Sequence, residues 1–195
     1  MIHLGMSGRF TVAPGDAEPE PHEQVVFRLA DGRKLRFRDP RRFGVVFALP
    51  STRLADDPHF VHLGVEPLEP GFDGAALRQA AAGRRGPVKA FLMDASVVVG
   101  GGNIYASEAL FEAGIHPLRS VARISAPRWD LLAEAVRSVL SRAIDQGGTP
   151  LNDFADADGQ RGYFQVSLAA YDREGQPCRR WGGPGGRSVL WKRRT

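Results

Sequence analysis

The first fifty residues alternate between apolar and polar positions in short stretches, a pattern typical of antiparallel strands. Residues 25–29 are mostly β-branched or aromatic, and residues 34–38 alternate strictly. Between them stands Asp31-Gly32, a pair that supplies the positive φ of a two-residue hairpin turn. The pattern therefore predicts a hairpin here, and it predicts further strands over residues 2–10 and 45–49.

The strict alternation in residues 34–38 also predicts which side chains share a face. Successive side chains of a strand point to opposite faces of the sheet. We therefore expect Leu35 and Phe37 to face a core. The basic side chains line the other face; they are Lys34, Arg36 and Arg38.

From about residue 70 the apolar period becomes helical. The pattern predicts short helices over residues 74–82 and 87–93, and a longer one over residues 103–113. The longest predicted helix has Ser125 as its N-cap, since serine accepts a hydrogen bond from the first helical turn. Its apolar stripe consists of Trp129, Leu132, Val136, Val139, Leu140 and Ile144. The chain thus reads as a β-rich half and a helical half.

Composition narrows the class of protein. The chain has 195 residues, of which 43% are hydrophobic and 25% charged, a balance that excludes a disordered chain. No apolar run approaches the length of a membrane helix, and no secretory leader is evident, so we expect a cytoplasmic, nucleoid-associated bacterial protein. The single cysteine, Cys178, excludes an intrachain disulfide and a cysteine-cluster zinc site.

The charge is unevenly distributed. The net charge of +4 comes from 26 basic and 22 acidic residues, yet no acidic residue follows Glu174. The last eighteen residues contain six basic ones. Such a segment indicates a polyanionic partner such as nucleic acid, with a solvated tail as the alternative.

Seven motifs follow one another along the chain. They are His3-Leu4-Gly5-Met6-Ser7-Gly8, Asp39-Pro40-Arg41-Arg42-Phe43-Gly44, His62-Leu63-Gly64-Val65-Glu66-Pro67-Leu68, Gly100-Gly101-Gly102-Asn103-Ile104-Tyr105-Ala106-Ser107-Glu108, Gly114-Ile115-His116-Pro117, Gly159-Gln160-Arg161-Gly162-Tyr163-Phe164 and Gly175-Gln176-Pro177-Cys178. In this order, and over nearly the whole chain, they resemble the formamidopyrimidine-DNA glycosylase family, the MutM-like branch of bacterial base-excision repair.

The resemblance implies an α+β fold in three parts. Residues 1–68 would form part of an N-terminal antiparallel β-sandwich, and residues 69–155 a helix–two-turn–helix domain. Residues 156–195 would contain a lesion loop and a degenerate, zincless β-hairpin finger. Members of the family bind double-stranded DNA between the two domains, flip out the damaged base, excise oxidised purines and cleave the abasic strand. The implied partner is damaged duplex DNA, with the protein acting as a monomer.

Positions that match the family's motifs are expected to bind DNA. They are Met6, His22, Arg41, Phe43, Arg85, Lys89, Asn103 and Tyr105. The family inserts the residues that match Met6 and Phe43 into the duplex, while the match to Arg41 reaches the orphaned base. Its phosphate grip matches Asn103, which stands where a glycine-rich turn enters a helix. The loop that closes over the extruded base matches Gly162, Tyr163 and Phe164.

Each of these assignments has a plain structural alternative. Met6 could pack under a turn, and residues 41–43 could be an exposed turn with one anchoring aromatic. Asn103 could merely cap its helix, and Tyr105 could be a core aromatic. The two basic residues before the glycine turn could belong to a solvated face. The predicted lesion loop could be a β-turn with packing aromatics.

The chain also departs from the family's pattern. The family's nucleophile is an N-terminal Pro followed by a Glu, whereas this sequence begins Met1-Ile2-His3. Of the family's two Cys-x-x-Cys pairs only Cys178 remains, so no zinc and no other cofactor is expected. Arg187 resembles the finger arginine that grips the lesion phosphate and aids catalysis.

We therefore expect a protein that binds damaged DNA without catalysis. One alternative is an active glycosylase and lyase whose true start lies upstream. The other is a non-functional fragment, or a module that binds RNA or an acidic protein.

Overall fold

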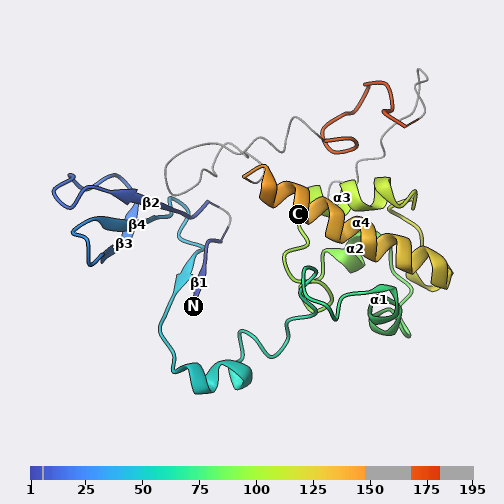
Figure 1. The fold of residues 1–195 in the computed structure, drawn as a ribbon, viewed down its shortest axis with the longest axis horizontal. Helices are drawn as coiled ribbons and strands as arrows, with labels where there is room; N and C mark the ends of the chain where they lie inside the picture. The colour runs from blue at the N-terminus through green and yellow to red at the C-terminus, as the bar shows by residue number, and fades with distance from the viewer. Residues whose placement is uncertain (6, 148–167, 181–195) are drawn as a thin grey trace. The chain divides into compact units, whose positions relative to one another are not determined.

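The computed structural model describes residues 1–5, 7–147 and 168–180. The described residues fall into two compact units, one built on residues 1–54 and the other on residues 55–142. The first unit contains the strands and the second contains most of the helices (Figure 1). The three-part division at residues 68 and 155 stays a prediction.

The first unit centres on a three-stranded antiparallel sheet with the order β2-β4-β3. The strands are β2 (Arg9–Ala13), β3 (Glu23–Arg28) and β4 (Lys34–Arg38). The predicted hairpin is confirmed, because β3 and β4 pair antiparallel and Gly32 between them has a φ of 85°. The predicted two-residue turn is wrong: the Leu29 amide donates to the Arg33 carbonyl at 2.9 Å, so the loop has three residues and Gly32 alone has the positive φ. Phe37 is buried as expected, and its ring stacks on Phe10 of the neighbouring strand at 5.1 Å.

Two predicted strands are shorter than the apolar pattern indicates. The prediction of one strand over residues 2–10 is wrong: the chain forms β1 (Ile2–His3), turns, and resumes as β2. Gly5 in that turn has a φ of 64°, a left-handed conformation that ends a strand. The strand predicted over residues 45–49 is only β5 (Val45–Val46), which pairs with β1.

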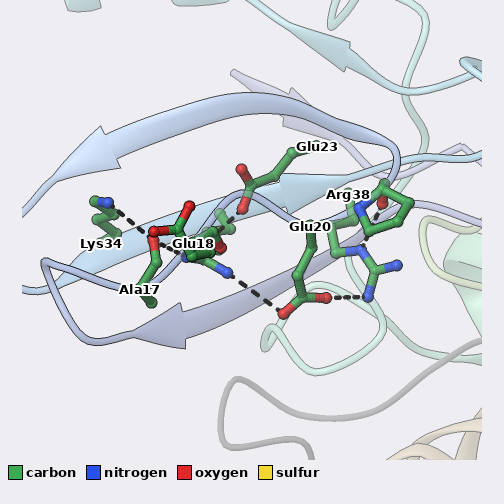
Figure 2. Close-up of polar contacts among 8 residues, drawn as sticks. Ala17, Glu18, Glu20, Glu23, Lys34 and Arg38 are labelled. Atoms are coloured by element: carbon green, nitrogen blue, oxygen red, sulfur yellow. Dashed lines mark hydrogen bonds and ion pairs between the residues drawn. The ribbon is translucent and has the colours of Figure 1, made fainter.

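The basic face of β4 is covered by the loop between β2 and β3 (Figure 2). The side chain of Arg36 is buried, and its Nη2 donates to the carbonyls of Ala17 and Glu18, both at 2.8 Å. Its Nε lies 2.9 Å from Oε1 of Glu23. The two groups form an ion pair, but the direction of the N–H bond does not meet the geometry of a hydrogen bond. Glu20 bridges Arg36 and Arg38, at 3.4 and 2.6 Å. The predicted basic face therefore holds a loop in place instead of facing open solvent.

The second unit packs its helices around a common core. A 3-10 helix, Ser51–Asp56, precedes them, and the α-helices are α1 (Gly74–Ala80), α2 (Val88–Leu92), α3 (Asn103–Glu112) and α4 (Ala126–Asp145) (Figure 1). Between α3 and α4 the chain makes turns and a short 3-10 helix, Val121–Arg123, which gives the helix–two-turn–helix arrangement. Trp129 is 1% exposed and its ring meets Phe91 edge-on at 5.6 Å.

The predicted stripe of α4 is confirmed over most of its length. Trp129, Leu132, Val136 and Val139 are buried. The stripe prediction is wrong at Ile144, which is 62% exposed near the end of the helix. No helix in the described ranges is long and apolar enough to cross a membrane.

Candidate nucleic-acid interface

The turn of residues 39–44 is held by a buried carboxylate. Asp39 is 1% exposed, and its Oδ2 accepts the Gly44 amide at 2.7 Å while its Oδ1 accepts the Arg41 amide at 3.3 Å. Burial raises the pKa of Asp39, but these hydrogen bonds and those from Ser7 and the Arg42 amide outweigh it and hold the pKa below its usual value. The turn also has Arg42 at a φ of 56°, a conformation rare for residues other than glycine.

This turn projects an arginine and a phenylalanine into solvent. The Arg41 guanidinium lies over the Phe43 ring, 4.9 Å from its centroid. Phe43 is 55% exposed, so it does not anchor the turn, and that alternative is wrong. Among the described residues no carboxylate forms an ion pair with Arg41. A cation and an aromatic ring are thus presented together on a fixed backbone.

His22 lies at the same end of the sheet as this turn. Its carbonyl accepts the Asp39 amide at 3.0 Å, and Glu23 next to it pairs with Arg38 at the end of β4. The imidazole is exposed, and the backbone φ of 66° is left-handed. Met6 lies outside the described residues, but Ser7, which follows it, donates its hydroxyl to Oδ1 of Asp39 at 2.9 Å.

The glycine-rich turn enters α3 without a side-chain cap. The N-cap is Gly102, and Asn103 is the first helical residue, so the capping alternative for Asn103 is wrong. Gly100 has a φ of 74°, which only glycine adopts readily. The first amides of a helix have no intrahelical acceptor and point outward with the positive end of the helix dipole. This end of α3 therefore has the chemistry of an anion site.

Tyr105 is the third residue of α3. Its side chain is half-buried and lines a small apolar cavity with Leu92, Val98 and Val136. This placement supports the core-aromatic alternative for the ring. Its predicted DNA contact stays a prediction.

The two basic residues before the glycine turn have different surroundings. Arg85 is exposed and lines an open hollow of about 320 Å³ with Arg78 and Arg84. Lys89 is 2% exposed on α2, and burial lowers the pKa of its ammonium. The solvated-face alternative is therefore wrong for Lys89 and fits Arg85, and the DNA contact of each stays a prediction.

Several predicted site residues lie outside the described ranges. They are Met6, Gly162, Tyr163, Phe164 and Arg187. Cys178 is described, half-buried and free of any disulfide. Within the described ranges no cluster of three His, Cys, Asp or Glu side chains is arranged to hold a metal ion.

Two buried carboxylates that hold neighbouring backbone segments in place were not predicted from the sequence. One is Asp39. The other is Glu108, which is 5% exposed in α3 and accepts the amides of Ala169, Ala170 and Tyr171 at 2.7 to 2.9 Å. A glutamate on an otherwise apolar helix face was the available signal for the second residue. Asp39 carried no such signal, because Asp-Pro is an ordinary turn dipeptide.

Family models match both halves of the chain. The model described as the formamidopyrimidine-DNA glycosylase N-terminal domain matches residues 1–46. The model of the same family's H2TH domain matches residues 63–155.

Curated relatives and solved structures agree with these models. A formamidopyrimidine-DNA glycosylase of Syntrophotalea carbinolica is 51% identical over 184 residues, covering 94% of this chain and 68% of the relative. One from Acidithiobacillus ferrooxidans is 50% identical, covering 98% of this chain and 72% of the relative. The crystal structure of MutM (Fpg) from Thermus thermophilus superposes with a TM-score of 0.83 at 37% identity, covering 94% of this chain and 67% of that one. A Lactococcus lactis Fpg in complex with DNA containing an abasic site gives a TM-score of 0.83 at 30% identity, covering 94% and 66%.

Proposed function

Because the chain belongs to the formamidopyrimidine-DNA glycosylase family, a family of base-excision-repair DNA glycosylases, we propose that residues 1–195 bind damaged double-stranded DNA. The observation that carries the proposal is the exposed Arg41–Phe43 pair on the turn fixed by Asp39. An exposed phenylalanine costs solvation free energy, and a base-sized gap in a duplex offers it a stacking partner. The adjacent guanidinium can donate to the edges of an unpaired base.

The second unit supplies a separate contact to the DNA backbone. The uncapped start of α3 presents amide donors, and Arg85 adds a positive charge on the same unit. Phosphate contacts of this kind position a protein on DNA without reading sequence. We therefore propose that the first unit probes the lesion and that the second unit binds the phosphates.

The salt dependence of DNA binding tests this proposal. We expect the polypeptide of residues 1–195 to bind a labelled duplex containing an abasic-site analogue, with an affinity that falls steeply as salt rises. Neutralised phosphates release counterions, so the logarithm of the binding constant falls linearly with the logarithm of the salt concentration. A binding constant that does not change with salt in a fluorescence anisotropy titration would contradict the phosphate contacts.

We further propose that a polypeptide of these residues binds without forming the covalent intermediate of the family. In such a polypeptide the Met1 amine donates to the carbonyl of Phe47 at 2.7 Å, and this contact would have to break before the amine could attack a sugar carbon. Borohydride trapping on a duplex containing oxidised guanine should give no protein–DNA adduct. A trapped adduct would contradict this proposal, because it would show that a polypeptide of these residues forms the covalent intermediate.

The remaining parts of the proposal follow from the DNA partner. A protein of this kind acts where the chromosome is, in the bacterial cytoplasm, and one copy is enough for one lesion. No cofactor is required for binding by the groups described above. Size-exclusion chromatography with light scattering, in the presence and absence of a short duplex, measures the proposed monomer and its one-to-one complex.

A further inference from the structure

We propose that Asp39 is a positioning residue for lesion recognition, which acts by holding the Arg41–Phe43 pair in the orientation that meets damaged DNA. This inference rests on the proposed function. Asp39 itself is buried, so it would act only through the turn.

The Asp39 carboxylate joins three separate points of the chain. It accepts the Ser7 hydroxyl at 2.9 Å, the Arg41 amide at 3.3 Å and the Gly44 amide at 2.7 Å. An ordinary aspartate turn needs only the contact two residues ahead. The contact to Gly44 closes the far end of the turn, and the contact to Ser7 ties it to the turn between β1 and β2.

The two turns that Asp39 connects approach each other closely. A Cβ atom added to Gly5 would lie 2.7 Å from the carbonyl carbon of Phe43, and one added to Gly44 would lie 2.5 Å from the Phe37 ring. The backbone at Phe43 is thus enclosed between the turn before Ser7 and the core of the sheet. Asp39 supplies the hydrogen bonds that hold this arrangement together.

Among the described residues, the side chains of Arg41 and Phe43 have little besides the backbone to orient them. Both are exposed, and the Arg41 guanidinium lies 4.9 Å from the centroid of the Phe43 ring. Their direction is therefore set by the backbone on which they stand. Loosening that backbone would remove preorganisation while leaving the positive charge and the aromatic ring in place.

The uncompensated charge of Asp39 also fits a role in geometry. Within the described residues no arginine, lysine or histidine forms an ion pair with it. Its carboxylate oxygens accept from the Ser7 hydroxyl and from the amides of Arg41 and Gly44, which are neutral donors, so the negative charge fixes amide and hydroxyl groups. An asparagine has the same shape but places an NH₂ group against one of these donors.

The test compares lesion preference in Asp39→Asn with that of the parent polypeptide of residues 1–195. Lesion preference is the affinity for a duplex with an abasic-site analogue divided by the affinity for the matching intact duplex. We expect the substitution to lower this ratio by about fivefold or more, since a lost hydrogen bond to a charged group has an effect of that size. The affinity for intact duplex and its salt dependence should stay unchanged, because the phosphate contacts lie on other residues.

A matched control separates positioning from general loss of stability. Glu23→Gln alters a half-buried carboxylate of the same sheet, one that pairs with Arg36 and not with the turn. We expect this variant to keep the lesion preference even where its thermal midpoint falls as far as that of Asp39→Asn. An equal fall of the ratio in both variants would overturn the inference.

A cycle of substitutions gives a readout that a purely structural role would not move. In the background Arg41→Ala with Phe43→Ala, Asp39→Asn should cause no further loss of lesion preference, since residues that act as one unit are not additive. A full additional loss would show that Asp39 acts elsewhere. Should Asp39→Asn fail to fold, Ser7→Ala removes one of the three contacts and should lower the ratio in the same direction; an unchanged ratio in folded Ser7→Ala would then overturn the inference.

Failure of the inference is distinguishable from failure of the proposed function. If the parent polypeptide itself shows a ratio of one, recognition of damaged DNA is lost as a proposal, and the inference with it. If the parent prefers the lesion and Asp39→Asn keeps that preference, only the positioning role is excluded.

Discussion

The guanidinium of Arg41 lies 4.9 Å from the centre of the Phe43 ring, and both side chains are exposed on a turn that the buried Asp39 carboxylate holds. A cation above an aromatic face is attracted by the ring quadrupole, although weakly at an exposed site. This weak contact adds to the orientation that the backbone gives the two side chains. A duplex that offers the ring a stacking site and the cation an acceptor would replace this contact with stronger ones.

Replacement of the cation should affect recognition and not stability. We expect Arg41→Ala to lower the preference for lesion duplex over intact duplex, while its free energy of unfolding changes by less than about 0.5 kcal/mol, as for most exposed sites. Anisotropy titrations and urea denaturation measure the two quantities. Arg53→Ala removes the same charge from an exposed position of the 3-10 helix and should keep the preference. An unchanged preference in Arg41→Ala would remove its probing role.

A negative charge at the start of α3 should separate stability from DNA binding. An acidic residue in the first turn interacts favourably with the helix dipole, so Asn103→Asp should raise the free energy of unfolding by about 0.3 to 1 kcal/mol. The same charge would repel a phosphate, so the affinity for duplex should fall, most strongly at low salt. Gln79→Glu adds the same charge to an exposed position of α1 and should affect binding much less. Equal affinity losses in the two variants would argue against a phosphate site at Asn103.

The turn that contains Gly5 packs closely against the turn of residues 39–44. Alanine at Gly5 and alanine at Gly32, two glycines with a left-handed backbone, should therefore destabilise the protein to different extents. Gly5 and Gly32 have φ values of 64° and 85°, so alanine at either position costs about 1 to 2 kcal/mol of backbone strain. A Cβ at Gly32 meets no atom within 4 Å, whereas one at Gly5 would collide with the backbone of Phe43. Gly5→Ala should therefore be the more destabilising of the two in urea denaturation. Equal losses of stability in Gly5→Ala and Gly32→Ala would contradict this, because they would mean that the Gly5 turn can move away from the turn of residues 39–44 at no cost in free energy.

We expect Asp94 to contribute to the fall in the free energy of unfolding at acidic pH. Hydrogen bonds from Ser96 and Arg84 lower the pKa of this carboxyl from 3.8 to about 2. A carboxyl with a lowered pKa in the folded state stabilises the protein fully above its unfolded value, and this contribution is lost as the pH falls from about 4 toward 2. The difference in free energy of unfolding between the parent and Asp94→Asn should shrink over that range. The difference should stay below about 1 kcal/mol at neutral pH, because the pair is largely solvent-exposed.

Ser96→Ala should remove only part of the pH-dependent stabilisation that Asp94 provides. Its hydroxyl donates to Asp94 at 2.6 Å, while Arg84 remains at 2.8 Å. We expect a smaller pH-dependent difference than for Asp94→Asn, measured by thermal unfolding between pH 2 and pH 5. A difference from the parent that stays constant across this range would contradict the linkage.

Much of the fold follows from short-range patterns in the sequence. The strand Lys34–Arg38 has the predicted bounds, because alternation and the Asp31-Gly32 turn specify it locally. Similarly, α4 follows from a stripe with a clear helical period. The division of residues 2–10 into two strands was not predictable from hydrophobicity, since it depends on the conformation of Gly5 and on the turn that packs against it.

The candidate site was predicted through its motifs, and the residues that support it were not. Arg41 and Phe43 stand out in the sequence because exposed turns rarely combine these side chains with a matching family pattern. Burial is what distinguishes Lys89 from Arg85, and it arises from the packing of α2 and not from local sequence. Asp39 and Glu108 act through partners distant in sequence, with Ser7 and Ala170 as examples. Such contacts are fixed only by the tertiary structure.

The affinity ratio of the polypeptide of residues 1–195 for two duplexes tests the central claim most directly. The duplexes have one sequence and differ only in that one carries an abasic-site analogue at its centre, and both are titrated by fluorescence anisotropy at the same moderate salt concentration. The exposed Arg41–Phe43 pair predicts tighter binding to the duplex with the lesion, and a ratio that falls when both side chains are replaced by alanine. Equal affinity for the two duplexes would contradict the account.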